Sequence, residues 1–497
     1  MKQIEAFRSL VKKQKAYEYA MAIVGWDSET EAPKGAFNRR SEMQGVLSSE
    51  YFKLVTHPET IEIIETLFAQ KDVLDPMLSR EVQKAKKALD KIIKIPESEF
   101  IDYQKLLVIA QRTWEEAKAQ SNYDLFKDTL AKIVAYNKKF VHYFQPDEHP
   151  YNVMLDDYEE GMSMRDYDQF FDQLKRDLVP FVKEVIEAAK DVRRDFVFLK
   201  YKEADQYRFC DYLIDELGFD RNHGLMKKSV HPFTWNTSPD DVRFTTRYME
   251  DYGLSSIYSV IHELGHALYE QHIDTVWDDT LLTQGTSMGI HESQSRLFEN
   301  TFGRSRAFWE RHFPKFASIF PEQTKNIRLE DMYMAVNHVE ASLIRVEADE
   351  LTYSLHIMIR YEIERQLMNG EISCDDLPRI WNEKMVEYLG IEPKDDAEGV
   401  LQDVHWSGGM IGYFPTYALG SAYAAQFYHV MQKELPIDDL IREGSFDQIN
   451  QWLKEKIHRH GSSKSPRELL IDVTGKDFDP EEYITYLKNK YTKLYLE

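Results

Sequence analysis

Residues 257–268 read IYSVIHELGHAL, a stretch whose apolar positions recur with the period of an α-helix. Those positions fall three or four residues apart, at Ile257, Ile261, Leu264 and Leu268. The stretch lies within residues 240–313, which contain no proline. Because a proline in a helix interior costs about 3 kcal/mol, a proline-free segment of this length can run as helix. The pattern therefore predicts a helix at this point of the chain.

The same features extend over much of the sequence. Residues 97–145, 181–231 and 322–377 also contain none of the 17 prolines. Glycine and proline do not gather into a linker, and no repeat or low-complexity tract is present. We therefore expect one mainly α-helical domain that spans residues 1–497.

Two stretches depart from the helical pattern. Residues 230–248 read VHPFTWNTSPDDVRFTTRY, with two β-prone runs on either side of a turn-rich segment, so they predict a small hairpin. Residues 406–420 read WSGGMIGYFPTYALG and are rich in glycine, which is typical of a loop that lines a cleft.

Charge and composition exclude several classes of protein. The formal net charge is −23, which argues against nucleic acid and against an anionic membrane surface as partners. Two cysteines, Cys210 and Cys374, are too few for a disulfide framework or a thiolate zinc cluster. The first residues lack the apolar core of a signal peptide, and no apolar run is long enough for a membrane span. We expect a cytoplasmic protein.

His262, Glu263 and His266 form an H-E-x-x-H motif within the predicted helix. Positions i and i+4 of a helix lie about 40° apart on one face, so both imidazoles can reach one zinc ion. The intervening Glu263 stands beside them, where its carboxylate can accept a proton from water. The motif predicts a catalytic zinc site.

A catalytic zinc ion needs a third protein ligand, and three residues compete for that place. A helix that continued past His266 would carry His272 about 9 Å further along its axis, out of reach. Glu292 follows Thr286 and Ser287, either of which can cap a second helix. Glu292 is the favoured ligand, and the neighbouring carboxylate of Glu299 is a further alternative.

Short motifs spread over most of the chain resemble one family, the metallocarboxypeptidases of the carboxypeptidase Taq type, among them the bacterial thermostable carboxypeptidase 1 group. The motifs are WDSETEAPKGA (26–36), HPF (231–233), DVRFT (241–245), HELGH (262–266), HESQ (291–294), IRVEAD (344–349) and GVLQDVHW (399–406). The resemblance implies a compact helical metallopeptidase fold with a deep substrate groove and a small sheet beside the active site, whose core lies at about 230–420. It also implies a homodimer and release of single amino acids from peptides with a free C-terminal carboxylate. Zinc is the expected metal ion, with cobalt as a candidate substitute.

The resemblance also suggests roles for residues outside the zinc motif. His405 and Tyr413, with Tyr417 nearby, are similar to the groups that donate hydrogen bonds to the oxyanion in helical zinc oligopeptidases. His231 is a candidate for binding substrate or the oxyanion, and a core histidine is its alternative. Arg345 is a candidate for holding the substrate carboxylate, because a guanidinium does so with two hydrogen bonds.

Some alternatives remain open at this point. Arg345 can instead pair with Glu347 or Asp349 on a solvated helix, and Asp241 and Arg243 can form a structural ion pair. A zinc oligopeptidase or dipeptidyl carboxypeptidase would use the same chemistry and release longer fragments. A non-catalytic helical scaffold that keeps zinc structurally is a more remote alternative, because a structural site has no use for Glu263.

Overall fold

The helix expected around residues 257–268 is α11 (Gly253–Gln271), and its four stripe residues are completely buried. Burial of one such side chain contributes about 1.5–3 kcal/mol, so the stripe fixes this helix in the core. α11 packs against α10 (Glu203–Glu216), α12 (Met288–Arg296) and strand β3 (Asp241–Thr246).

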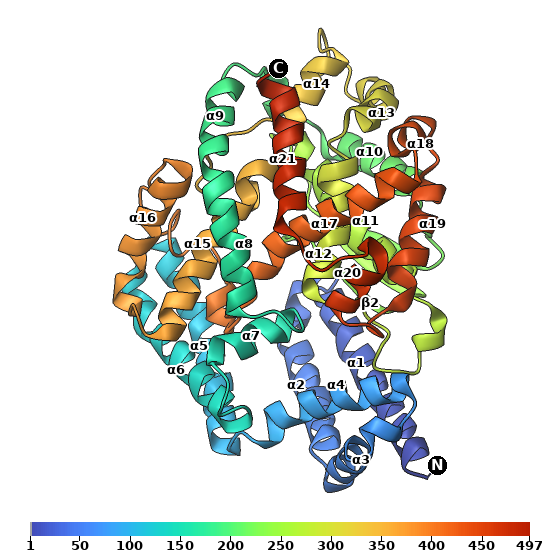
Figure 1. The fold of residues 1–497 in the computed structure, drawn as a ribbon, viewed down its shortest axis with the longest axis vertical. Helices are drawn as coiled ribbons and strands as arrows, with labels where there is room; N and C mark the ends of the chain where they lie inside the picture. Colours follow the sequence, from blue (N-terminus) through green and yellow to red (C-terminus); the bar gives the residue numbers. More distant parts are fainter. Residues whose placement is uncertain (1) are drawn as a thin grey trace.

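The computed structural model describes residues 2–497, which fold as helices with one small sheet (Figure 1). The other α-helices are α1 (Lys2–Thr30), α2 (Phe37–Val55), α3 (Pro58–Phe68), α4 (Pro76–Ile93), α5 (Glu97–Ala119), α6 (Lys127–Phe144), α7 (Pro150–Tyr158), α8 (Met164–Asp177), α9 (Val179–Ala189), α13 (Arg306–Ile319), α14 (Leu329–Val336), α15 (Glu350–Asn369), α16 (Leu377–Leu389), α17 (Pro415–Glu434), α18 (Ile437–Glu443), α19 (Phe446–Lys456), α20 (Pro466–Thr474) and α21 (Pro480–Tyr495). The mainly α-helical fold class is confirmed.

The sheet contains the predicted hairpin and one strand that the sequence did not predict. β2 (Thr234–Ser238) pairs antiparallel with β3, as expected. β1 (Gly224–Lys228) pairs parallel with the other edge of β3, which gives the order β1-β3-β2. A side chain at Gly224 would stand 2.1 Å from the Val242 carbonyl oxygen, so glycine permits this approach. The sequence of β1, GLMKK, has little β-propensity, and pairing with β3 decides its conformation.

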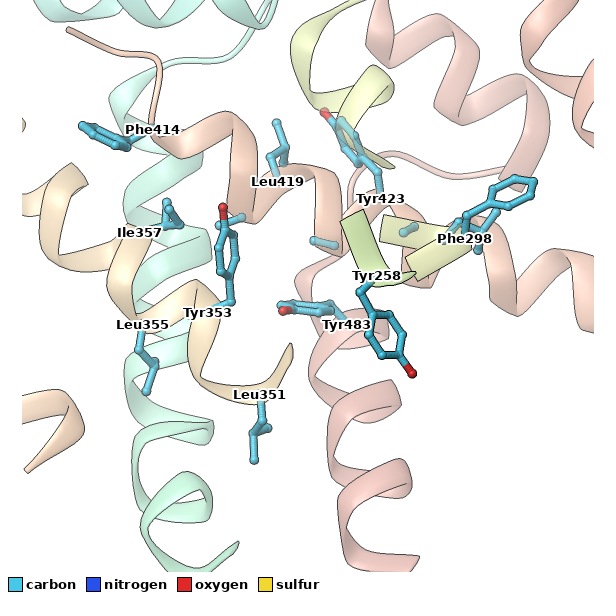
Figure 2. Close-up of a cluster of buried hydrophobic side chains, with 14 of the residues drawn as sticks. Tyr258, Phe298, Leu351, Tyr353, Leu355, Ile357, Phe414, Leu419, Tyr423 and Tyr483 are labelled. Carbon is cyan, nitrogen blue, oxygen red and sulfur yellow. The ribbon is translucent and has the colours of Figure 1, made fainter. Parts of the chain in front are cut away.

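The core is deepest around α15 and α17, which pack against each other and are buried over most of their surfaces. α17 also packs against α12 and α21. Figure 2 shows Tyr353 of α15, Leu419 of α17 and Tyr483 of α21 in this part of the core. α17 therefore supports both α12 and α15.

The proline criterion fails at one helix. Pro314 lies inside α13, although long helices were expected only in segments without proline. Phe308, Trp309 and Phe316 of α13 are completely buried. Tertiary burial of three aromatic side chains offsets the cost of about 3 kcal/mol for the internal proline.

The N-terminal helices bury a second, smaller apolar cluster on α1, α3 and α4. They gather at the lower end of the molecule in Figure 1. α1 also reaches the sheet, because the ring of Trp26 lies 5.6 Å from Phe233 and 6.4 Å from Trp235. In the part of the chain that the structure describes, no helix has both the length and the apolar composition needed to cross a membrane.

Candidate active site

α11 and α12 bring three potential metal ligands together. His262 and His266 project from α11, and Glu292 projects from α12. The Glu292 Oε2 atom lies 3.8 Å from His262 Nε2 and 3.5 Å from His266 Nε2. The candidate ligand atoms of all three residues lie within 4.8 Å of one another. The geometry therefore places the favoured third ligand, Glu292, beside the two histidines of the motif.

Two glycines allow this close approach. A Cβ atom at Gly265, inside the H-E-x-x-H motif, would stand 2.5 Å from the carbonyl oxygen of Gln294 on α12. A Cβ atom at Gly420 of α17 would stand 2.5 Å from Glu292 Cγ. Ser287 caps the start of α12, because its Oγ accepts a hydrogen bond from the Ile290 amide at 3.1 Å, as the capping prediction expected.

The rival ligands lie outside the group. Glu299 Oε2 lies 2.9 Å from His262 Nδ1, so this carboxylate contacts the outer nitrogen of a ligand. It stands on a short π-helical turn, Leu297–Phe302, which directly follows α12. His272 Nδ1 lies 3.0 Å from the Nδ1 atom of His458.

Arg296 controls the charge of this group. Its Nε donates to Glu292 Oε1 at 2.7 Å, and its Nη1 donates to Glu299 Oε2 at 3.2 Å. Burial alone would raise the pKa of Glu292, but Arg296 and His262 hold that pKa well below its usual range. Burial lowers the pKa of His266 to about 3. The site therefore offers an ionised carboxylate beside a neutral imidazole, which are the forms that bind metal ions.

Glu263 is buried beside these ligands, and a strand of the small sheet orients it. The Thr234 hydroxyl, on β2, donates to Glu263 Oε2 at 2.6 Å. Burial raises the pKa of Glu263, partly opposed by His262 and by this hydrogen bond. A raised pKa suits a carboxylate that accepts and returns a proton.

Side chains in and next to the glycine-rich stretch form a second cluster of polar residues, the second polar group. His405 Nε2 lies 3.3 Å from the Tyr417 hydroxyl, and the rings of His405 and Tyr413 lie 5.5 Å apart. Burial lowers the pKa of His405 to about 4, so its imidazole is neutral near pH 7. His405 begins a 3₁₀ turn, His405–Gly408, Tyr413 lies in the loop before α17, and Tyr417 lies in the first turn of α17.

Arg345 belongs to this second group, and its partner is one that the sequence did not suggest. Its Nε and Nη2 both donate to Asp403 Oδ1, at 3.0 and 2.8 Å, and its Nη1 donates to the Tyr353 hydroxyl at 3.0 Å. The solvated pair with Glu347 or Asp349 is wrong, because Arg345 is only 5% exposed. Asp349 instead caps α15.

Tyr353 joins the two groups. The guanidinium of Arg296 lies 4.1 Å from the centre of the Tyr353 ring, and the Tyr353 hydroxyl accepts a hydrogen bond from Arg345. Nothing in the spacing of the sequence indicated Tyr353 or Arg296. Asp403 lies within the GVLQDVHW motif, so motif membership was a signal for it.

The two remaining expectations have different outcomes. His231 is exposed on the loop before β2, so its alternative as a core histidine is wrong. Asp241 and Arg243 form the expected ion pair, with Arg243 Nε 2.6 Å from Asp241 Oδ1.

A family model described as "Carboxypeptidase Taq (M32) metallopeptidase" matches residues 6–491. The chain belongs to this family. Carboxypeptidase 1 of Bacillus subtilis is 43% identical over 491 residues, covering 99% of this chain and 98% of the relative. Thermostable carboxypeptidase 1 of Pyrococcus furiosus is 37% identical over 501 residues, covering 98% and 99%. The crystal structure of the M32 carboxypeptidase from Deinococcus radiodurans superposes with a TM-score of 0.96 at 33% identity, covering all of both chains.

Membership of the carboxypeptidase Taq (M32) family makes this protein a metallocarboxypeptidase, a hydrolase acting on peptide bonds, and excludes the scaffold alternative. The family implies a divalent metal ion. Two imidazoles and one carboxylate, with ligand atoms within 4.8 Å of one another, fit such an ion.

Proposed function

We propose that this M32 enzyme is a zinc-dependent carboxypeptidase that releases single amino acids from the C-termini of peptides. The observation that supports it best is the group formed by His262, His266 and Glu292, with Glu263 buried beside it. The names of the relatives, carboxypeptidase 1 and thermostable carboxypeptidase 1, support the same reaction.

His262, His266 and Glu292 would hold the zinc ion. When bound in such a site, zinc polarises a carbonyl oxygen and lowers the pKa of water. Glu263 accepts a proton from the attacking water and later passes it to the leaving amine. The Thr234 hydroxyl keeps the Glu263 carboxylate oriented for both transfers.

Hydrogen-bond donors for the oxyanion would come from the second polar group. His405 is neutral near pH 7 because burial lowers its pKa to about 4, so one of its ring nitrogens carries a proton to donate. Tyr413 is a second donor, and His231, from the loop before β2, is a candidate for contact with the substrate. Donors of this kind contribute about 3–4 kcal/mol each.

Arg345 is proposed to bind the substrate carboxylate. Asp403 and Tyr353 occupy three of its five N–H donors, so two remain for a ligand. Asp403 is also bound by Arg360, which leaves two guanidinium groups against one carboxylate. This excess of positive charge favours an anionic partner.

The remaining expectations from the sequence are part of the proposal. They are peptides with a free C-terminal carboxylate as partners, cobalt as a substitute for zinc, a homodimer as the assembly and the cytoplasm as the location.

A time course of one peptide tests the reaction. With a free-acid peptide and zinc, mass spectrometry is expected to show a ladder of single-residue losses from the C-terminus. The same peptide with an amidated C-terminus is expected to react far more slowly, because it lacks the charge that Arg345 would bind. Release of dipeptides or longer fragments, or equal rates for the two peptides, would instead favour the dipeptidyl carboxypeptidase or oligopeptidase alternative.

Replacement of Arg345 tests the carboxylate contact. Arg345→Ala is expected to lower kcat/KM for the free-acid peptide by roughly ten- to hundredfold, because a charge-assisted contact contributes about 1.5–3 kcal/mol. Arg345→Lys should recover part of this loss, since an ammonium group cannot form the paired hydrogen bonds. The amidated peptide should lose much less.

Arg360→Lys is the matched control. Arg360 binds the other oxygen of Asp403, with Nη2 2.6 Å from Oδ2, and is completely buried. Its replacement is expected to lower thermal stability and to affect both peptides equally. If the Arg345 variants also affect both peptides equally, Arg345 is a structural partner of Asp403 and another residue binds the carboxylate.

A further inference from the structure

We propose that Glu270 and His291 are positioning residues that fix the tautomer of His266, so that its Nε2 atom faces the metal site. The H-E-x-x-H motif does not include either residue, and His291 precedes Glu292 directly in the HESQ motif. The proposal rests on the proposed metal site. It adds two hydrogen-bonded side chains, His291 and Glu270, behind one proposed ligand.

The distances form a continuous chain. His266 Nδ1 lies 2.6 Å from His291 Nδ1, and His291 Nε2 lies 2.7 Å from Glu270 Oε1. Glu270 is 4% exposed and follows His266 by one turn of α11. The Asn236 side-chain amide donates to Glu270 Oε2 at 2.7 Å, and the Gly285 amide donates to Oε1 at 3.2 Å.

The order of donors and acceptors follows from Glu270. An ionised carboxylate only accepts hydrogen bonds, so His291 Nε2 carries the proton of that contact. In neutral His291, Nδ1 is then an acceptor. This acceptor faces His266 Nδ1. His266 Nδ1 must therefore carry a proton and donate it to His291 Nδ1. The lone pair of His266 is thereby left on Nε2, the atom that lies 3.5 Å from Glu292 Oε2.

The opposite arrangement would disable the ligand. If His291 donated from Nδ1, His266 Nδ1 would have to accept, and the proton of neutral His266 would move to Nε2. A protonated Nε2 cannot bind a metal ion. The carboxylate of Glu270 therefore determines, through one intervening ring, which nitrogen of His266 is free.

The other histidine ligand is held differently. His262 Nδ1 faces the Glu299 carboxylate directly, at 2.9 Å, so it needs no intermediate ring. Partners of this outer kind commonly change metal affinity by about 10–100-fold when they are removed. His291 is also packed tightly, since a Cβ atom at Gly285 would stand 2.6 Å from its Cδ2. A purely structural role for His291 is therefore the alternative that an experiment must exclude.

Zinc affinity, measured by competition with a chromophoric chelator, separates the two roles. His291→Phe keeps a ring and removes both nitrogens, and it is expected to weaken zinc binding by about 10–100-fold. His291→Asn offers an amide oxygen near the position of Nδ1, and it should restore most of the affinity. Rescue by Asn, which is smaller than Phe, would not occur if only packing mattered.

Two further variants complete the test. Glu270→Ala is expected to weaken zinc binding in the wild-type background, but to change it by no more than about twofold in His291→Phe, because Glu270 acts through that ring. His458→Phe is the matched control. His458 is another buried imidazole against the same two helices, 2.9 Å from Gln294 Oε1. It should lower the unfolding temperature and leave zinc affinity unchanged.

The outcomes are distinct. Wild-type affinity in His291→Phe, or equal loss of affinity in His291→Phe and His458→Phe without rescue by Asn, would overturn the positioning role. If Glu292→Ala binds zinc as tightly as the wild type, the proposed metal site itself is wrong. The unfolding temperature of each metal-free variant shows whether its fold is retained.

Discussion

Glu263→Gln is expected to reduce peptide hydrolysis by about 10²–10⁴-fold, the range that general acid–base catalysis contributes. The amide has nearly the shape of the carboxylate, and its oxygen can still accept the hydrogen bond from Thr234. It cannot accept a proton from water. Zinc content and the unfolding temperature should therefore stay close to those of the wild type while kcat falls. The measurement is kcat on a free-acid peptide, together with zinc per chain.

Glu263→Asp is the matched control for position. It retains a carboxylate but draws it back by one methylene, and a displacement of about 1 Å in an active site can cost 100-fold. We expect Glu263→Asp to be more active than Glu263→Gln and much less active than the wild type. Activity of Glu263→Gln within tenfold of the wild type, with zinc bound, would contradict the role of Glu263 as the base.

Glu292→Ala is expected to cause the largest loss of metal binding. It removes the only carboxylate of the group in the described residues, so zinc affinity should fall by more than the roughly 10–100-fold of an outer contact. The rise in unfolding temperature that zinc gives the wild type should disappear, since that rise depends on preferential binding to the folded protein. The fold should remain, because α12 is held by buried residues such as Ile290 and by its contacts with α17.

The two rival ligands are the controls for this experiment. His272→Ala should leave zinc affinity unchanged, because His272 contacts His458 and not the metal group. Glu299→Gln should weaken zinc binding less than Glu292→Ala does, because Glu299 contacts the outer nitrogen of His262. If His272→Ala releases zinc and Glu292→Ala does not, the third ligand has been assigned wrongly.

The contacts around Arg345 include an ion pair that the sequence did not suggest. The neighbouring acidic residues Glu347 and Asp349 suggested an ion pair within one helix. In the structure Arg345 lies on a 3₁₀ turn and its partner is Asp403, 58 positions later. Helical spacing predicts contacts only within a helix, so it could not indicate this pair.

The sheet and α13 likewise combine features that local sequence predicts with features that depend on distant segments. The hairpin was predictable, because β2 and β3 are adjacent in sequence and rich in β-branched and aromatic residues. β1 and the continuation of α13 through Pro314 were not predictable from the sequence. Their conformations depend on β3 and on aromatic burial, which are provided by other parts of the chain.

The sequence by itself determined the helical class of the protein, two candidate metal ligands four residues apart, Glu263 between them, and the motifs that place the chain among the carboxypeptidase Taq relatives. These features are local or are short patterns in a fixed order, and the geometry of one helix is enough to interpret them. Only the tertiary structure decided how closely Glu292 approaches His262 and His266, which nitrogen of each histidine faces it, and that Glu270 reaches His266 through His291. These depend on the close approach of α11 and α12 at Gly265, where the packing of distant segments sets the distances.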